Sequence, residues 1–285
     1  MIAETYRAVR RKTASLLNGY IMPRLGFKVV RSRPNNFRYT KLASHFGITT
    51  LSVTRVGGGE FKVRLRESTS DWMTFDQIFL DEDYDLRPLS RYGELAALYK
   101  RLCREGSPLI VDLGGNIGLS PLYFSAMWPE AQVVTVEPDE QNFTLLAENV
   151  GQRKQIDTIL AGAASRATRL KIIDPKAGKN AFRTETSSVG LIPGITVTEI
   201  LTNYCAKGCI PFAVKIDIEG VEAELFSDST DWINEFPLII IELHDWLFPG
   251  KRTSTNFLRA VSGLDRDFIY LDENIFSIKN SLMLS

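Results

Sequence analysis

The stretch LIVDLGGNIGLS, residues 109–120, decides the fold class of this chain. Its first half is mostly apolar and predicts a buried strand. Its second half carries glycines at 114, 115 and 118, which let a backbone turn tightly and approach a ligand closely. We expect a helix directly afterwards, because Ser120 and Pro121 suit a first helical turn. The stretch therefore predicts a strand, a ligand-facing turn and a helix.

The same alternation of strand and helix continues along the chain. Apolar strand patterns occur at 131–138, 212–218 and 237–244, and a helical pattern occupies 139–150. Parallel strands joined by helices form a doubly wound sheet, and ligands bind beyond the carboxyl ends of its strands. We therefore predict a mostly parallel, doubly wound α/β domain over residues 67–285.

The part of the chain before this domain has a different character. Residues 4–18 predict a short basic helix, and 48–66 predict a β-hairpin that turns at a glycine triplet. Helical patterns at 71–80 and 90–104 then lead into the domain. Residues 1–66 are therefore expected to form a basic N-terminal arm and hairpin extension.

The charge balance hides an asymmetry. The 285-residue chain has a formal net charge of zero, yet residues 1–41 hold ten Lys or Arg against one acid. Residues 42–285 hold 24 basic and 33 acidic side chains. An even total argues against a chain-wide nucleic-acid binder, and no nucleic-acid partner is expected. The basic arm leaves open a different function: docking to an acidic membrane surface, a nucleic acid or a partner subunit.

The apolar runs and the cysteines of the sequence exclude some further classes of protein. The longest apolar run is five residues, Leu95 to Tyr99, which is too short for a transmembrane helix. Three scattered cysteines favour a reducing compartment, so a cytoplasmic location is expected. Cys205 and Cys209 have no second pair, so they do not predict a zinc site. His45 lies outside every motif and is expected to be structural.

Two classes of cofactor compete for the glycine-rich turn. A dinucleotide fingerprint needs G-x-G-x-x-G, and that pattern ending at Gly118 would place Leu113 at its first glycine. Asp112 precedes the turn, and a carboxylate there suits a cationic ligand better than a pyrophosphate. Glu137 ends the second strand and is placed to accept ribose hydroxyls, which both dinucleotides and S-adenosylmethionine carry. The D-x-G-x-x-x-G spacing resembles motif I of class I S-adenosylmethionine-dependent methyltransferases.

Several motifs, taken in order, resemble one family. These are Thr69-Ser70-Asp71, DLGGNIGLS at 112–120, EP…NF..L..N from Glu137 to Asn149, KIDIEG at 215–220 and IELH at 241–244. Together they resemble the FkbM-type methyltransferases, from about Ser68 to the C-terminal strands. The resemblance implies a seven-stranded Rossmann-like methyltransferase sheet, S-adenosylmethionine as cofactor, and methylation of hydroxyls on sugars, glycoconjugates or secondary metabolites.

The resemblance also implies the residues that bind the cofactor. The predicted contacts to its methionine end are Asp112, Gly114, Asn116 and Gly118. Glu137 would hold the ribose, and Asn142 would stiffen the helix beside it. Ser70 and Asp71 would close over the pocket. The family usually has Ala at Gly115, a departure expected only to loosen the loop.

Methyl transfer from a sulfonium needs alignment and, for a hydroxyl acceptor, removal of a proton. Lys215, Asp217 and Glu219 share one face of a strand pattern and should converge at its end. Glu242 and His244 end the neighbouring strand. Because histidine titrates near neutral pH, we hypothesise that His244 or Asp217 is the base and that Glu219 orients or charges the site.

Other interpretations of these residues stay open. A divalent metal ion would have suitable ligands in Asp217, Glu242 and His244. Lys215 would alternatively form a structural ion pair with Asp217 or Glu219, and His244 would be a core or capping residue. Trp246 and Phe248 would either stack on a sugar or anchor their loop. Residues 174–194 and the loop after His244 are expected to line the acceptor site.

Three further functions remain beside O-methylation. Methylation at nitrogen or at a carboxylate would need less base. A cofactor-binding protein without turnover is possible in principle, although the intact acids of KIDIEG and IELH favour catalysis. Docking through the basic arm is the third.

Overall fold

The computed structural model describes residues 35–151, 153–173, 183–186 and 192–283. The helix expected at 4–18 and most of the stretch at 174–194 lie outside these residues. The chain from Phe37 to Ser285 forms one compact unit, and the fold below is that of this unit. Among the described residues, no helix combines the length and apolar character needed to span a bilayer.

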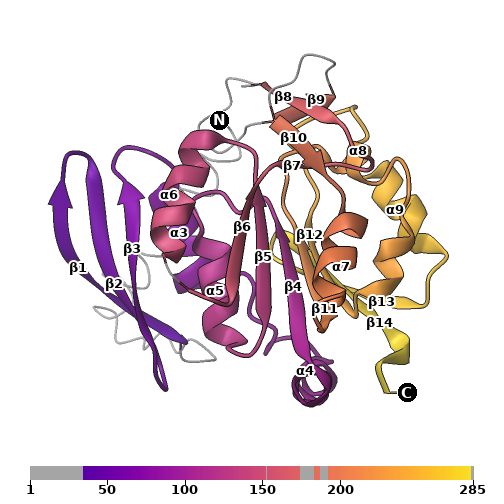
Figure 1. The fold of residues 1–285 in the computed structure, drawn as a ribbon, viewed down its shortest axis with the longest axis horizontal. Coiled ribbons are helices and arrows are strands. Elements are labelled where there is room, and N and C mark those ends of the chain that lie inside the picture. Colours follow the sequence, from indigo (N-terminus) through magenta and orange to yellow (C-terminus); the bar gives the residue numbers. More distant parts are fainter. Residues whose placement is uncertain (1–34, 152, 174–182, 187–191, 284–285) are drawn as a thin grey trace, which may run out of the picture. The chain divides into compact units, whose positions relative to one another are not determined.

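A seven-stranded sheet forms the centre of the unit (Figure 1). Its order is β13-β14-β12-β11-β4-β5-β6, and β6, β5, β4, β11 and β12 run parallel, whereas β14 is antiparallel to both of its neighbours. The strands are β4 (Ser107–Leu113), β5 (Gln132–Glu137), β6 (Ile156–Leu160), β11 (Cys209–Ile216), β12 (Leu238–Glu242), β13 (Arg266–Leu271) and β14 (Asn274–Lys279). The predicted mostly parallel, doubly wound sheet is confirmed.

Helices cover both faces of this sheet. One layer contains α4 (Tyr92–Glu105), α5 (Leu119–Met127) and α6 (Glu140–Val150). The other contains α7 (Val197–Cys205), α8 (Glu222–Leu225), the 3-10 turn η3 (Asp231–Glu235) and α9 (Thr255–Ser262). Because side chains alternate along a strand, each strand supplies both cores: Ile110 packs with the first layer, and its neighbours Leu109 and Val111 pack with the second.

A separate three-stranded antiparallel sheet precedes the domain, in the order β1 (Phe37–His45), β2 (Ile48–Arg55), β3 (Glu60–Arg66). The hairpin predicted at 48–66 is confirmed, and its three turn glycines all have positive φ. The sequence analysis missed β1. This strand carries His45, which is exposed and pairs with Ile48 next to the turn.

The three-stranded sheet shares a hydrophobic core with the main domain. Phe37 and Val63 belong to the same buried cluster as Phe79 and Tyr123. Figure 1 shows β3 beside α6, and the side-chain amide of Asn149 in α6 bonds the backbone of Arg64 in β3. The compact unit thus begins before residue 67. The division into an extension up to 66 and a methyltransferase domain from 67 stays a prediction.

Shorter elements complete the unit. The helix predicted at 71–80 is α3 (Asp71–Phe75), continued by a π-helical turn, η2 (Asp76–Asp81). A small sheet of β7 (Gly162–Ala163), β10 (Ile192–Ile195), β8 (Arg169–Ile173) and β9 (Arg183–Thr186) lies near the carboxyl ends of the parallel strands (Figure 1). The 3-10 turn η4 (Asn280–Met283) follows β14.

Candidate active site

The glycine-rich turn after β4 is held tightly against the neighbouring strand ends. The amides of Gly114 and Gly115 both donate to the carbonyl of Val136 at the end of β5. Gly114 has φ +86°, and a Cβ there would lie 1.9 Å from the carbonyl oxygen of Asp217. Only glycine allows this close approach of the two strand ends. The turn is therefore built to bring the β4 loop and the β11 end together.

Gly115 corrects an expectation from the sequence. A Cβ at this position would lie 2.1 Å from Thr135 Oγ1 and 2.9 Å from a methyl group of Leu146. The Thr135 hydroxyl is itself fixed, because it donates to Asp112 at 2.7 Å. Glycine is thus required by packing here and does not merely loosen the loop. Gly118 has a similar role, since a Cβ would come within 3.3 Å of Leu146 in α6.

Glu137 lies where the sequence predicted it, at the carboxyl end of β5. It is buried, and it accepts hydrogen bonds from the amides of Asn116 at 2.8 Å and Asp139 at 3.0 Å. Burial raises the pKa of this carboxyl to about 7, although these donors oppose the shift. The backbone of Asn116, at φ +48°, is thus fixed by the acid expected to hold the ribose.

A chain of polar contacts connects Glu137 to the N-terminal sheet. The side-chain amide of Asn142 lies 3.5 Å from Glu137 Oε1, and its oxygen accepts from Arg66 at 2.9 Å. Arg66 forms a two-pronged pair with buried Asp71. Asp71 therefore holds an arginine that the sequence analysis missed. The Ser70 hydroxyl is buried and has no hydrogen-bond partner within the described chain.

Asp112 and Lys215 form a buried ion pair on adjacent strands. Lys215 Nζ lies 3.2 Å from Asp112 Oδ1, and Asp112 Oδ2 accepts from Ser120 and Thr135. Lys215 also donates to the carbonyl of Gly114 at 2.7 Å. Burial opposes the lysine charge, but Asp112 and other neighbours raise the pKa of Lys215 above its usual value.

This pair changes two predicted roles. Both side chains are almost completely buried, and neither lines the hollow described below. The carboxylate of Asp112 is matched by Lys215, so its charge is not directed at a cationic cofactor. The expected ion pair of Lys215 was with Asp217 or Glu219, but its nearer partner is Asp112, at 3.2 Å, with Asp217 at 3.5 Å. The catalytic role of Lys215 stays a prediction.

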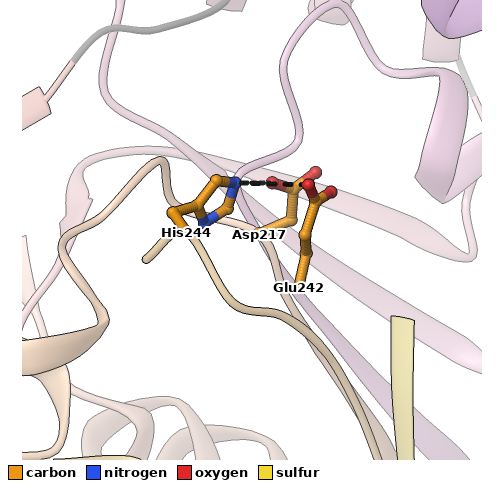
Figure 2. A group of neighbouring side chains, drawn as sticks. All are labelled: Asp217, Glu242 and His244. Atoms are coloured by element: carbon orange, nitrogen blue, oxygen red, sulfur yellow. Dashed lines mark ion pairs between the residues drawn. The ribbon is translucent and has the colours of Figure 1, made fainter. Parts of the chain in front are cut away.

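A second group of charges gathers at the ends of β11 and β12. Figure 2 shows the His244 ring facing the carboxylates of Asp217 and Glu242. His244 Nε2 lies 3.6 Å from Asp217 Oδ1, 3.7 Å from Glu242 Oε1 and 3.8 Å from Glu219 Oε2. Asp217 and Glu219, two of the three residues predicted to converge, thus lie with Glu242 and His244 from the neighbouring strand.

The other side of the His244 ring contacts a residue that the sequence analysis missed. Nδ1 lies 2.7 Å from Glu222 Oε1 in α8, and both side chains are buried. Burial opposes a charged ring, but the hydrogen bond with Glu222 and the nearby acids raise the pKa of His244 to about 10. Both ring nitrogens face carboxylates, and the role of His244 as the base stays a prediction. The sequence signal that could have indicated this contact is Glu222 itself, an acid two residues after the KIDIEG motif.

The two groups of residues meet in a single hollow among the strand ends. Its lining joins the cofactor loop to the acids and consists of Gly114, Asn116, Val136, Glu137, Pro138, Asn142, Gly162, Ala163, Asp217, Ile218, Glu219 and Val221. Predicted cofactor residues and predicted catalytic acids thus share one space. Gly118, Ser70 and Asp71 do not line this hollow and act on it through packing or through other side chains.

The two aromatic residues of the loop after His244, Trp246 and Phe248, have different surroundings. A Cβ at Gly220 would lie 2.4 Å from the Phe248 ring, so Phe248 packs on the backbone after β11 and anchors the loop. Trp246 has 43% of its surface exposed, with its ring centroid 6.3 Å from that of His244. Trp246 is therefore accessible beside the acids.

The residues around the hollow fit S-adenosylmethionine. Glu137 offers a carboxylate at the strand end where ribose hydroxyls bind in such sheets. The side-chain oxygen of Asn116 is buried and accepts no hydrogen bond within the described chain, so it is available to a bound donor. The tight glycine turn leaves room for a ligand to approach the backbone. A seven-stranded sheet with this loop and these acids defines a Rossmann-like methyltransferase.

Comparisons with known proteins identify the family. The model of the Methyltransferase FkbM domain matches residues 112–270, which is more than half of the chain. The chain belongs to this family of methyltransferases and uses S-adenosylmethionine. No curated protein matches the sequence.

Solved structures of methyltransferases are also similar to the chain. A putative caffeoyl-CoA O-methyltransferase from Staphylococcus aureus is 14% identical, with 73% of this chain and 92% of that chain covered and a TM-score of 0.37. Fibrillarin from Aeropyrum pernix, with natively bound S-adenosyl-L-methionine, is 13% identical, with coverages of 85% and 99% and a TM-score of 0.36. TrmK from M. capricolum, in complex with S-adenosyl-homocysteine, is 16% identical, with coverages of 64% and 67% and a TM-score of 0.33.

Proposed function

We propose that the protein transfers a methyl group to a hydroxyl of a sugar, a glycoconjugate or a related secondary metabolite. The observation that carries this proposal is the hollow shared by the cofactor loop and by the acids Asp217 and Glu219. A hydroxyl acceptor must lose its proton, and these carboxylates border the space where the acceptor would lie. A carboxylate acceptor would meet like charge there, which disfavours carboxyl methylation.

The chain's own residues supply position and proton transfer. S-adenosylmethionine, when bound, supplies a methyl group on a positively charged sulfur. The acceptor oxygen forms its bond to the methyl carbon while the carbon–sulfur bond breaks, and that electron pair remains on the now neutral sulfur. Asp217 or Glu219 takes the hydroxyl proton. Alignment of oxygen, carbon and sulfur by the walls of the hollow provides most of the remaining acceleration.

An exposed aromatic ring beside the acids favours a sugar acceptor. The exposed surface of Trp246 lies next to His244 in the loop expected to line the acceptor site. Aromatic rings present an apolar face with a polar edge, which suits the mixed surface of a sugar ring. This accessibility supports a sugar or glycoconjugate over a wholly apolar metabolite.

The test is a screen of nucleotide-sugars and glycolipids with the full chain and S-adenosylmethionine. Mass spectrometry and NMR would identify the methylated atom, which we expect to be a hydroxyl oxygen. Asp217→Asn should lower kcat by about 10²- to 10⁴-fold, the usual contribution of a proton acceptor, while cofactor affinity changes little. Asp228→Asn, an equal change in charge at an exposed residue that does not line the hollow, should keep its kcat.

Two results would contradict this function. One is incorporation of the methyl group at nitrogen or at a carboxylate with every accepted substrate. The other is full turnover in both Asp217→Asn and Glu219→Gln, because those two carboxylates border the hollow.

A further inference from the structure

The acids at the ends of β11 and β12 surround one imidazole nitrogen. One ligand atom each of Asp217, Glu242 and His244 lies within 4.8 Å of the others, and Figure 2 shows the two carboxylates side by side before the ring. Glu219 adds a third carboxylate, 3.8 Å from His244 Nε2. The side chain of Glu219 starts from left-handed backbone, at φ +54°, which turns this residue out of the strand direction. The nitrogen thus faces three acids.

The distances between His244 Nε2 and the carboxylate oxygens are longer than hydrogen bonds. A charged hydrogen bond from an imidazolium to a carboxylate closes to about 2.7–2.9 Å. The three distances from His244 Nε2 are 3.6, 3.7 and 3.8 Å, so among the described residues no carboxylate reaches it at hydrogen-bonding distance. Metal–ligand bonds of about 2.0–2.2 Å place two ligand atoms of one ion no more than about 4.4 Å apart. The separations of His244 Nε2 from Asp217 Oδ1 and from Glu242 Oε1, 3.6 and 3.7 Å, are within this limit.

The buried partner of His244 gives an independent indication. Glu222 Oε1 lies 2.7 Å from Nδ1, and the amide of Gly220 donates to the same oxygen at 3.1 Å. Metal-binding histidines almost always donate their second ring N–H to a carboxylate or carbonyl, which turns the other nitrogen toward the metal. His244 is only 2% exposed, and its Nε2 faces the carboxylates of Asp217, Glu219 and Glu242.

Lys215 is the buried cation beside these acids, and it also contacts Asp112. Lys215 Nζ lies 3.5 Å from Asp217 Oδ2, but it is closer to Asp112, at 3.2 Å, and donates to the Gly114 carbonyl. Lys215 is thus shared between Asp112 and Asp217. An added cation is the simplest balance for the acids around His244.

We propose that Asp217, Glu242 and His244 bind one divalent cation of the Mn²⁺ type, with Glu222 as the residue that positions His244. Carboxylate oxygens with a single imidazole form a mixed donor set that suits such ions. The proposal rests on the proposed function and deepens it. With Asp217 bound to the cation, Glu219 would take the hydroxyl proton, and a cation at this edge of the hollow would stabilise the developing negative charge on an acceptor oxygen.

Direct binding of Mn²⁺ tests the site without turnover. The full chain is first treated with a chelator and then titrated with MnCl₂, and electron paramagnetic resonance reports the free ion. We expect one Mn²⁺ per chain. His244→Ala and Glu242→Gln should each weaken binding at least about tenfold, and Glu222→Gln about 10- to 100-fold, as loss of an orienting partner does. Asp245→Asn should bind within about twofold of the natural chain.

Circular dichroism and thermal unfolding would establish that each variant is folded. The proposal is overturned if the natural chain binds no Mn²⁺, or if folded His244→Ala and Glu242→Gln bind it as the natural chain does. Failure of the proposed function is a separate result. Mn²⁺ bound at the cluster without any hydroxyl methylation would support the metal site and refute the function, whereas hydroxyl methylation by a chain that binds no Mn²⁺ would do the reverse.

Discussion

Two groups of charges lie within a few residues of each other and differ in their balance. Lys215 and Asp112 face each other in register on β11 and β4, and both are almost fully buried. Two residues farther along, Asp217 has 28% of its side chain exposed and lies among other acids around His244. The first group is a matched pair with hydroxyl and carbonyl partners. The second keeps surplus negative charge at the edge of a hollow.

The difference distinguishes charged residues that stabilise the fold from charged residues that are placed to act on a ligand. A buried charge without a partner is very unfavourable, so Lys215 and Asp112 depend on each other, and their mutual attraction fixes the glycine turn. Surplus charge at a partly open site is tolerated when a ligand completes it, and perturbed acids gather at functional sites for this reason. The same acidic residue type thus has opposite roles at positions 112 and 217.

The largest effect is expected from breaking the matched pair. Asp112→Asn would leave the Lys215 ammonium buried without its main counter-charge, so we expect the free energy of unfolding to fall by about 3–5 kcal/mol. Urea unfolding followed by circular dichroism measures this change. Lys215→Met in the Asp112→Asn background should recover part of the loss, because the double variant has no unpaired buried charge. Strictly additive losses would show that the pair is not coupled.

Most of the fold followed from patterns in the sequence. Buried parallel strands are continuous apolar runs, and glycine-rich turns are easily recognised, so the central sheet was predictable. β1 was missed because most of its side chains are exposed, so its sequence lacks the clear alternation of a half-buried strand. The π-helical turn after Phe75 was likewise missed, because helical spacing alone does not distinguish the kinds of helix.

The parts of the site that could be predicted are the residues whose place follows from their position at the end of a strand. Strand periodicity predicted that Lys215, Asp217 and Glu219 share one face, but β11 ends at Ile216 and Glu219 reaches the acids from left-handed backbone. Periodicity also does not tell that burial removes Lys215 from the hollow. Glu222 and Arg66 act through partners distant in sequence, His244 and Asn142. Such contacts depend on tertiary packing, which a single sequence does not encode locally.

Glu137 offers a third case, because it is buried and its hydrogen bonds among the described residues come from neutral donors, the amides of Asn116 and Asp139 and the side chain of Asn142. With its folded pKa raised to about 7, the carboxylate is present above that pH and is lost as the pH falls below it. Hydrogen bonds from ribose hydroxyls to a charged group are worth about 1.5–3 kcal/mol. We therefore expect S-adenosylmethionine affinity to fall about 10- to 100-fold as the pH is lowered from 8 to 5, measured by calorimetric titration.

The matched control for this prediction is Glu137→Gln. The cofactor's own titrating groups affect both proteins equally, so the difference between the two pH profiles isolates Glu137. The glutamine variant should bind weakly at pH 8 and lose little further affinity at pH 5. Parallel profiles for the two proteins would show that Glu137 does not contact the cofactor through its charged form.

The smallest effect on stability is expected from the same acid-to-amide change in the unbalanced group. Glu242→Gln removes one carboxylate from the neighbourhood of Asp217 and Glu219 while leaving a side chain of the same shape. Less like charge remains but the contact with His244 is weakened, so the two effects oppose each other and the free energy of unfolding without added metal should stay within about 1 kcal/mol of the natural chain. Urea unfolding beside Asp112→Asn gives a direct contrast. A loss as large as that of Asp112→Asn would mean that Glu242 is also a matched structural charge, and the distinction between the two groups would fail.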